Sequence, residues 1–214
     1  MLLNNCNLNI MDTISGYKDR ALESLKGNWD KGIIATVIYF AVEEVGSLLL
    51  SLVVGEGTLG MVLNLAWMLL CLPISWGYSV YFLRLVRKED LAYGHLFDGF
   101  SDLVRIICTY FLGGLAVVIG TMLLIVPGII VALMLSQISF VLKDHADMGA
   151  IDVLKKSADI MNGHKMDYFL MMLSFIGWFL LSCLTLGLGF LFLAPYWYTT
   201  TAHFYEDLKA EQAW

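Results

Sequence analysis

The chain has 214 residues, of which 59% are hydrophobic and 15% are charged. Its mean hydropathy of +0.74 is too high for a soluble protein, because a core of this size cannot hide so much apolar surface from water. We therefore expect a lipid bilayer to cover the excess. The formal net charge of −6, with no basic helix that carries interleaved aromatic residues, argues against nucleic acid as a partner.

The N-terminal part of the chain, residues 1–32, is expected to be a cytoplasmic or interfacial segment. The first ten residues have neither a basic n-region nor a long apolar h-region, so they do not predict a cleavable signal peptide. A first membrane hairpin is predicted at residues 33–86. Its two apolar runs, Ile33–Val54 and Leu59–Val86, are each long enough to cross a hydrocarbon core of about 30 Å.

Two further apolar stretches predict two more hairpins. The second, residues 103–142, needs a turn near Gly120–Gly128, where several chain breakers leave the position open. The third, residues 167–208, is expected to fold back around Leu184–Gly189, and residues 209–214 form a cytoplasmic tail. The predicted fold class is all-α, a polytopic transmembrane bundle of six spans in three hairpins.

The basic residues predict the orientation of the chain. Lys and Arg in short loops mark the cytoplasmic face, and all thirteen fall on one side of the predicted spans. The three opposite turns contain a single charged residue, Glu56. Both termini are therefore expected in the cytoplasm. The basic residues are Lys18, Arg20, Lys26, Lys31, Arg84, Arg87, Lys88, Arg105, Lys143, Lys155, Lys156, Lys165 and Lys209.

A threefold parallel repeat is indicated when the hairpins are aligned on their prolines. Pro73, Pro127 and Pro195 each fall in the returning helix of one hairpin. A short amphipathic stretch that ends in glycine precedes each hairpin, and such stretches can lie along the membrane interface. We expect three copies of an interfacial helix plus a hairpin, packed about an axis normal to the membrane. The stretches are Ser24–Gly27, Leu96–Gly99 and Ile160–Gly163.

The segment Asp147–Lys165 is expected to form one of these interfacial helices. Its apolar residues recur at helical spacing, which predicts that one face rests on lipid or on the bundle. The residues of this stripe are Ile151, Leu154, Ala158 and Met161.

The acidic pair Glu43 and Glu44 interrupts the first predicted span and is a candidate intramembrane polar site. An ionised carboxylate at the bilayer centre is costly, and neighbouring helix residues point about 100° apart. We therefore expect at least one of the two to face the bundle interior, either protonated or paired with a polar group. The alternative is a span that begins earlier or tilts, so that the pair lies near the outer surface and water solvates it.

A second candidate cluster lies at the predicted cytoplasmic rim. His203 and Glu206 are one helical turn apart there, and a shared metal or ligand site is chemically feasible. The alternative is that polar residues gather at the rim because water is present. The cluster contains His95, Asp98, His145, His203 and Glu206.

No catalytic or cofactor-binding motif is found, so no cofactor or metal is predicted and an enzyme is not favoured. Gly55–Gly60 fits the pattern G-x-G-x-x-G, but it follows an apolar helix rather than a β-strand, and we interpret it as an exposed turn. Neither G-x-S-x-G nor H-E-x-x-H is present. The cysteines form no close pair and are expected to be packing residues. They are Cys6, Cys71, Cys108 and Cys183.

Several segments together resemble one family. They are Leu25–Trp29, Leu96–Phe100, Val126–Ile130, Ser157 with Met161–Lys165, Ser174–Trp178, and Ala194–Tyr196 with Phe204–Tyr205. With them the chain resembles the bacterial integral membrane proteins grouped as domain-of-unknown-function family nine-seventy-five. The resemblance implies a multi-pass protein of the bacterial cytoplasmic membrane with about six spans. It implies no activity and no catalytic residues.

Three functions are compatible with these observations. A membrane scaffold with a protein partner at its cytoplasmic face is favoured, because amphipathic stretches are present and catalytic patterns are missing. A transporter or channel for a small solute or ion that uses Glu43 and Glu44 is the alternative. A lipid-handling membrane enzyme is a further alternative. A polar cavity that reaches Glu43 or Glu44 would favour the transporter, whereas a sealed apolar bundle would favour the scaffold.

Overall fold

The structure, a computed structural model, describes residues 11–54 and 57–212. Cys6 and the first two residues of the predicted glycine turn, Gly55 and Glu56, lie outside these ranges. The regular secondary structure in the described ranges is helical. The elements are α1 (Ile14–Leu25), α2 (Trp29–Phe40), the π-helical η1 (Ala41–Val45), α3 (Gly46–Val54), α4 (Thr58–Val86), the 3-10 helix η2 (Tyr93–Asp102), α5 (Leu103–Leu123), α6 (Ile125–Met134), α7 (Ile138–Asp144), α8 (Ala150–Ile160), α9 (Lys165–Leu173), α10 (Ile176–Leu184) and α11 (Phe190–Glu211).

Five of the described segments are long and apolar enough to cross a membrane. The all-α prediction is confirmed, and the five segments agree with the expectation of a multi-pass membrane protein. α11 occupies the place of the sixth predicted span, but it is not one of the five. They are Trp29–Val54, Thr58–Val86, Tyr93–Leu123, Ile125–Asp144 and Lys165–Leu184.

The predicted turns coincide with observed helix ends. α3 and α4 are joined by residues 55–57, and α10 and α11 by residues 185–189. In the second hairpin, Leu124 alone separates α5 from α6 and has an extended backbone (φ −166°, ψ 151°). The two helices approach closely because Gly120 and Gly128 face each other: a methyl group added at Gly120 would lie 3.2 Å from the Gly128 Cα.

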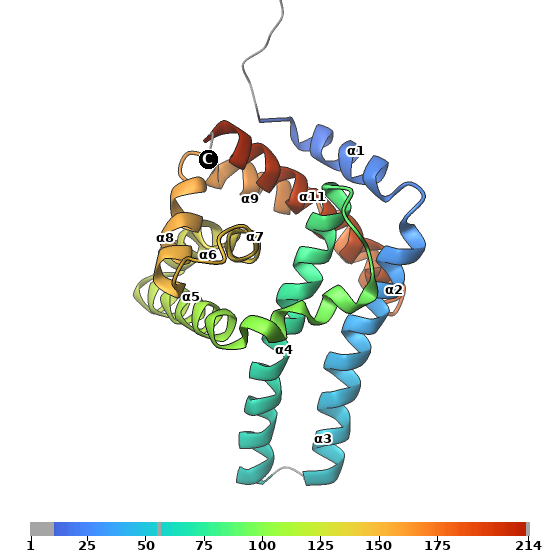
Figure 1. Cartoon of the computed structure of the whole chain (residues 1–214), viewed down its shortest axis with the longest axis vertical. Helices are drawn as coiled ribbons and strands as arrows, with labels where there is room; N and C mark the ends of the chain where they lie inside the picture. Colours follow the sequence, from blue (N-terminus) through green and yellow to red (C-terminus); the bar gives the residue numbers. More distant parts are fainter. Residues whose placement is uncertain (1–10, 55–56, 213–214) are drawn as a thin grey trace, which may run out of the picture.

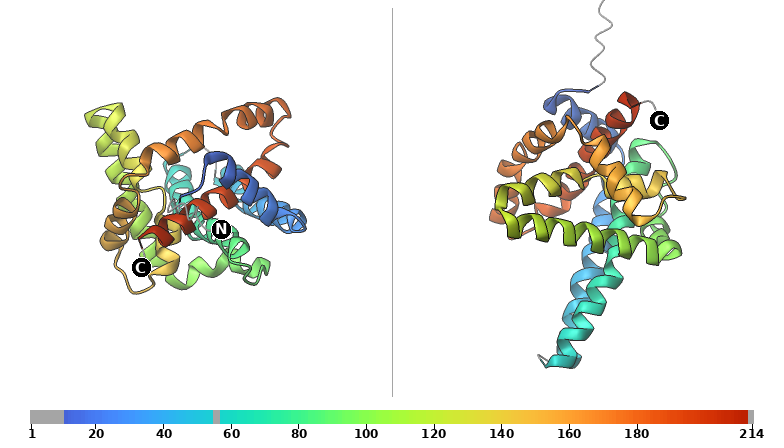
Figure 2. Two further views of the ribbon diagram at one scale, coloured as in Figure 1. Left: turned by 90° about the horizontal axis from the view of Figure 1, so that it is seen from above. Right: turned by 90° about the vertical axis from the view of Figure 1, so that its left-hand side faces the viewer.

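The three hairpins extend in different directions from a shared core (Figures 1 and 2). α3 and the first half of α4 form an arm that projects beyond the rest of the molecule, and α5 and α6 lie across the direction of this arm (Figure 2). α11 packs against α1, α2, α4 and α10. The start of α1 and the end of α11 lie at the same end of the molecule, opposite the tip of the arm (Figure 1).

The predicted amphipathic stretch Ser24–Gly27 covers only the end of α1 and the turn that follows it, and α1 as a whole packs on α11. The Tyr17 and Phe204 rings meet edge to face with their centroids 5.4 Å apart. Arg20 donates to both carboxylate oxygens of Asp207, at 2.8 and 3.0 Å. Part of the apolar face of this predicted interfacial helix is therefore covered by protein.

Helix α8 forms inside the predicted segment 147–165 and turns a particular face to the bundle. Val153 and Ser157 are completely buried, whereas Ile151 is 59% exposed. The Ser157 hydroxyl donates to the Met134 carbonyl at 2.9 Å, which holds this face of α8 against α6. The buried face of α8 is thus rotated around the helix from the predicted apolar stripe, which includes Ile151.

Glycines allow η2 to lie directly on α4. A methyl group at Gly77 of α4 would overlap the carbonyl group of Leu96 in η2, and a methyl group at Gly99 of η2 would overlap the carbonyl group of Pro73 in α4. Each backbone therefore contacts the other where a side chain is missing. This crossing fixes the start of the second hairpin against the returning helix of the first.

Candidate functional site

A cavity of about 340 Å³ lies where helices of all three hairpins meet. Its walls come from α4, α5, the junction of α6 and α7, α9 and α11. The lining side chains are hydroxyl-bearing and aromatic, and no charged side chain is among them. They are Ser75, Ser79, Tyr110, Ser136, Ser139, Phe140, Tyr168, Trp197, Tyr198 and Thr201.

The break between α6 and α7 places polar groups at this cavity. The helix is interrupted at residues 135–137; Ser136 lies in the break, and Ser139 lies in the first turn of α7. Ser139 is held from two sides, because its hydroxyl lies 2.7 Å from the Tyr110 hydroxyl and its carbonyl accepts the Trp76 indole N–H at 2.9 Å. These contacts join α4, α5 and α7.

Gln137 adds a buried amide beside the cavity. Its side chain is fully buried and donates to the Ser136 hydroxyl at 3.0 Å. The amide oxygen has no hydrogen-bond partner among the described residues. A buried acceptor of this kind costs about 1–3 kcal/mol when nothing donates to it.

The chemistry of the lining favours an uncharged polar ligand. Hydroxyl groups both donate and accept hydrogen bonds, so they match solutes that carry hydroxyl or amide groups. The Ser79 and Thr201 hydroxyls donate to carbonyl groups of their own helices, at 3.0 Å for each, and their oxygen lone pairs can still accept. The aromatic rings supply flat apolar surface for the carbon skeleton of such a solute.

The acidic pair lies in the π-helical turn η1, which separates α2 from α3. Trp67 of α4 packs on this turn, because its indole N–H donates to the Glu43 carbonyl at 3.4 Å and its ring occupies the space left by Gly46. Glu43 is half-buried, whereas Glu44 is exposed and lines a shallow groove with residues of α2 and α11. The two carboxylates thus have different surroundings, and π-helical turns are often found at functional sites.

Tyr39 connects Glu43 to the cavity. The Tyr39 hydroxyl lies 2.9 Å from the hydroxyl of Ser75, which lines the cavity, and it is within electrostatic reach of the Glu43 carboxylate. Tyr198, another lining residue, lies within electrostatic reach of Glu43. The sequence singled out the acidic pair. The sequence gives no sign of Tyr39, and Ser75 is one of several polar residues of the other predicted spans that could pair with the acids.

The predicted rim residues are distributed over separate contacts. His95 and Asp98 lie together, with His95 Nδ1 2.9 Å from an Asp98 carboxylate oxygen. His203 Nε2 lies 2.9 Å from the Ser24 hydroxyl, and Glu206 accepts from Arg87. His145 follows α7, where its carbonyl accepts from Arg105 at 2.8 Å. In the part of the chain that the structure describes, no three His, Cys, Asp or Glu side chains are placed to hold a metal ion.

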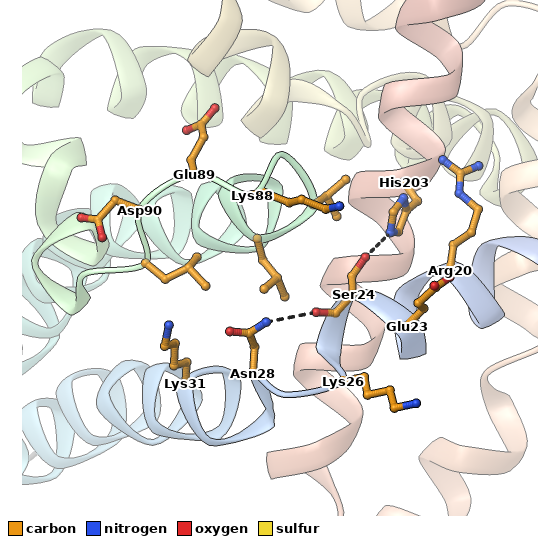
Figure 3. A pocket seen from close by; sticks show the side chains of 13 residues that line it. Arg20, Glu23, Ser24, Lys26, Asn28, Lys31, Lys88, Glu89, Asp90 and His203 are labelled. Atoms are coloured by element: carbon orange, nitrogen blue, oxygen red, sulfur yellow. Dashed lines mark hydrogen bonds between the residues drawn. The ribbon is translucent and has the colours of Figure 1, made fainter.

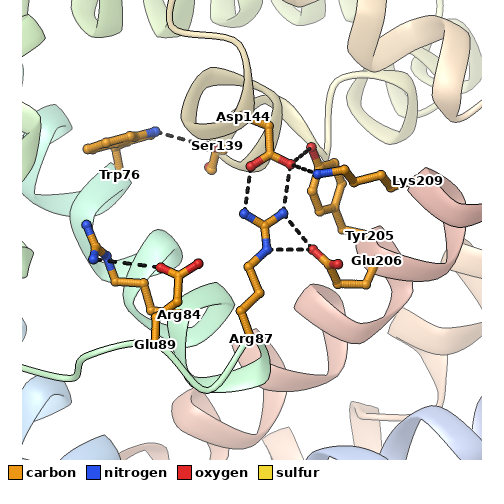
Figure 4. A network of polar contacts seen from close by, with 9 residues as sticks. All are labelled: Trp76, Arg84, Arg87, Glu89, Ser139, Asp144, Tyr205, Glu206 and Lys209. Carbon is orange, nitrogen blue, oxygen red and sulfur yellow. Dashed lines mark hydrogen bonds and ion pairs between the residues drawn. The ribbon is translucent and has the colours of Figure 1, made fainter. Parts of the chain in front are cut away.

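A charged network joins the ends of the three returning helices (Figure 4). Arg87 follows α4 and donates to both oxygens of Asp144 at the end of α7, at 2.7 Å each. Asp144 also accepts from Lys209 of α11 at 2.7 Å and from Tyr205 at 3.1 Å. Glu206 of α11 accepts from Arg87 at 2.7 and 2.9 Å.

This network keeps Arg87 charged. Burial lowers the pKa of the Arg87 guanidinium, but its bonds to Asp144 and Glu206 raise that pKa by more, so it lies above its ordinary value. The planar guanidinium of Arg87 donates two parallel hydrogen bonds to the carboxylate of Asp144. The sequence places Arg87 and Lys209 among the basic residues and Glu206 in the predicted rim cluster, but their pairing with Asp144 depends on the packing of three hairpins.

A larger open cavity, of about 740 Å³, lies beside the connection between α1 and α2 (Figure 3). Its second wall is the end of α4 and the loop that follows it. Most of the polar residues on its walls are charged, in contrast to the uncharged lining of the cavity at the hairpin junction. They are Arg20, Glu23, Ser24, Lys26, Asn28, Lys31, Lys88, Glu89, Asp90 and His203.

Part of the chain matches a protein-family model. Residues 109–212 match the family model described as "Protein of unknown function (DUF975)". The matched region runs from within α5 to the end of α11, and it contains most of the residues that line the cavity at the hairpin junction. The resembling segments 25–29 and 96–100 precede it. No curated protein and no solved structure matches the chain. The resemblance inferred from the sequence is thus confirmed over residues 109–212, where the chain is similar to the DUF975 family of proteins of unknown function.

Proposed function

We propose that this chain binds a small uncharged polar solute in the cavity at the hairpin junction and moves it across a membrane. The observation that carries the proposal is the lining: hydroxyl groups and aromatic rings from five helical segments, with no charged side chain. Helices of all three hairpins contribute, so a change in the angle between hairpins would open or close the cavity. Transporters often place their substrate site between repeated units of this kind.

The proposal includes six spans, with α11 as the sixth. α11 is less apolar than the other five, but Thr199–Tyr205 are buried inside the protein. A helix that is covered by other helices does not have to be as apolar as one that faces lipid. We also propose the three-hairpin repeat, which is supported by one proline each in α4, α6 and α11. The bacterial cytoplasmic membrane and cytoplasmic termini are part of the same proposal and rest on the family resemblance and on the positions of Lys and Arg.

Glu43 is proposed as the acidic group of the site. Its connection to Ser75 through Tyr39 gives a path along which a proton or a change in hydrogen bonding can reach the cavity. Glu44, which is exposed, is proposed to have no part in the site. Coupling of transport to a proton gradient follows from an intramembrane acid that binds and releases a proton on alternate sides.

The other two functions have less support. The amphipathic stretches and the missing catalytic patterns favour the scaffold, and a sealed apolar bundle would support it further. A polar cavity close to Glu43 supports the transporter instead. A lipid-handling enzyme would be supported by histidine and carboxylate groups in one cavity. The lining at the hairpin junction contains neither. The cavity beside the α1–α2 connection has both, but its histidine, His203, is paired with the Ser24 hydroxyl at 2.9 Å.

The first experiment identifies the solute class. The purified chain in detergent is heated in the presence of a panel of polyols, sugars, amides and amino acids, and the unfolding temperature is measured. Ser79→Ala removes a lining hydroxyl that donates only to its own helix, and Ser51→Ala removes a similar hydroxyl from α3, away from the cavity. We expect at least one uncharged solute class to raise the unfolding temperature of the wild type and Ser51→Ala, with a smaller effect on Ser79→Ala.

Uptake into proteoliposomes then tests transport of that solute. Glu43→Gln is expected to lose the dependence of uptake on a pH gradient, and Glu44→Gln is expected to retain it. A panel in which no solute separates Ser79→Ala from Ser51→Ala would contradict the proposed binding site.

A further inference from the structure

The open cavity beside the α1–α2 connection has walls from two parts of the chain that are distant in sequence. One wall is residues 20–31, and the other is the end of α4 with the loop at residues 88–91. Figure 3 shows Lys31 pointing from α2 into the space between the walls and the Lys88 side chain extending toward His203. Gly27, with φ +84°, forms the turn that brings the two helices of the first wall together.

On these walls, most of the acidic side chains have an ion-pair partner, but most of the basic side chains have none among the described residues. Arg20 is bound to Asp207, Glu89 lies 3.8 Å from Arg84, and Asp90 lies 3.2 Å from His95. The side chains of Lys26, Lys31 and Lys88 make no hydrogen bond or ion pair with another residue in ranges 11–54 and 57–212. Glu23 is the only lining acid without such a partner in those ranges. Three available cations therefore face one available anion, in a chain whose net charge is −6.

Lys88 occupies a backbone position at which glycine is preferred. Its φ is +57°, and the hydrogen bonds from the Lys88 and Glu89 amides to the Leu85 and Arg84 carbonyls, at 3.2 and 2.9 Å, form the usual end of a helix with a left-handed residue. A side chain is disfavoured there because its Cβ is crowded by the backbone. The lysine is present despite this disadvantage, and its ammonium group extends along the cavity wall.

We propose that this cavity binds a phosphate group, with Lys31 and Lys88 as the main ligands and Lys26 at its edge. Lysine ammonium groups bind phosphate as compact charges, and the nearby Ser24 and Asn28 side chains are neutral polar groups that complete the lining. The phosphate would belong either to the headgroup of an anionic phospholipid or to a soluble phosphate ester. The inference is independent of the solute site, which lies at the hairpin junction.

The test uses the full chain in nanodiscs. Unfolding temperatures are measured in phosphatidylcholine alone, with added phosphatidylglycerol, and with millimolar inorganic phosphate. The double variant Lys31→Gln/Lys88→Gln is compared with the wild type and with Lys155→Gln, which removes a lysine with 72% side-chain exposure on α8. We expect phosphatidylglycerol or inorganic phosphate to raise the unfolding temperature of the wild type and Lys155→Gln, and the double variant to lose most of this increase.

The two probes distinguish the source of the phosphate. An increase with phosphatidylglycerol alone identifies a lipid headgroup, and an increase with inorganic phosphate identifies a soluble ligand. Equal responses of all three proteins to both probes would overturn the proposal. Lys88→Gly supplies a second check, because glycine suits the backbone: this variant is expected to unfold at a higher temperature without a probe and to respond less to it. A full response of Lys88→Gly would exclude Lys88 as a ligand.

Discussion

The network around Asp144 is predicted to hold the three returning helices together. Asp144→Asn removes the negative charge that Arg87 and Lys209 share while it keeps the size of the side chain. The Asp144 side chain is 9% exposed and that of Arg87 is 20% exposed, so water replaces little of the lost interaction. The asparagine oxygen can still accept one of the two bonds from Arg87.

The expected loss of stability follows from how deeply the ion pair is buried. Removal of one partner from a buried ion pair costs about 3–5 kcal/mol, and an exposed pair contributes about 0–1 kcal/mol. Because Glu206 and Lys209 are about one-third exposed, we place Asp144→Asn near the lower end of the buried range, at about 3 kcal/mol. For a chain of this length, that loss corresponds to a decrease in unfolding temperature of roughly 6–12 °C.

The assay is thermal unfolding in detergent, with Asp152→Asn as the matched control. Asp152 pairs with Lys155 at 3.8 Å, and both side chains are mostly exposed, so this variant is expected to lose less than about 1 kcal/mol. A double-mutant cycle with Arg87→Gln should give a coupling energy of at least about 1 kcal/mol. Equal unfolding temperatures for Asp144→Asn and Asp152→Asn would refute the view that the network joins the hairpins.

Three further predictions concern backbone positions. Gly77→Ala is expected to lower the free energy of unfolding by about 2 kcal/mol, because its methyl group overlaps the backbone of η2. Gly114→Ala in α5 should raise that free energy by up to about 1 kcal/mol, because a methyl group there meets open space. A chemical denaturation series compares the two variants. Lys88→Gly is expected to raise the free energy of unfolding by about 1 kcal/mol in the same series, and a decrease would contradict the assigned backbone strain. Gly46→Ala is expected to disturb the π-helical turn because its methyl group meets Trp67, and Trp67→Leu should partly restore the unfolding temperature of that variant.

Much of the fold was predictable because it depends on local hydrophobicity. The end of α3, the start of α4 and the connection at residues 185–189 follow from where apolar runs end. The close approach of Gly120 and Gly128 follows from small residues at helical spacing. The place of α11 was less predictable. Hydropathy reports exposure to lipid, so a helix that is covered by protein gives a weak signal even when it is central to the fold.

The site was predictable only in part. The acidic pair stood out because carboxylates are rare in apolar runs, but the difference between Glu43 and Glu44 arises from a π-helical turn that no sequence pattern indicated. The hydroxyl-lined cavity gathers single serines and tyrosines from five segments, and each of them alone is an ordinary residue of a membrane helix. Only the packing of the three hairpins brings them together.

The reactivity of a cysteine at position 79 tests the central claim, a polar cavity at the hairpin junction. Ser79→Cys is made in a background without the four native cysteines, and its rate of reaction with a small water-soluble thiol reagent is measured in nanodiscs. Ser157→Cys is the control, because Ser157 is fully buried between α8 and α6. We expect Ser79→Cys to react at least about tenfold faster than Ser157→Cys, since water fills a polar cavity of this size. Equal, slow reaction of the two cysteines would contradict the account.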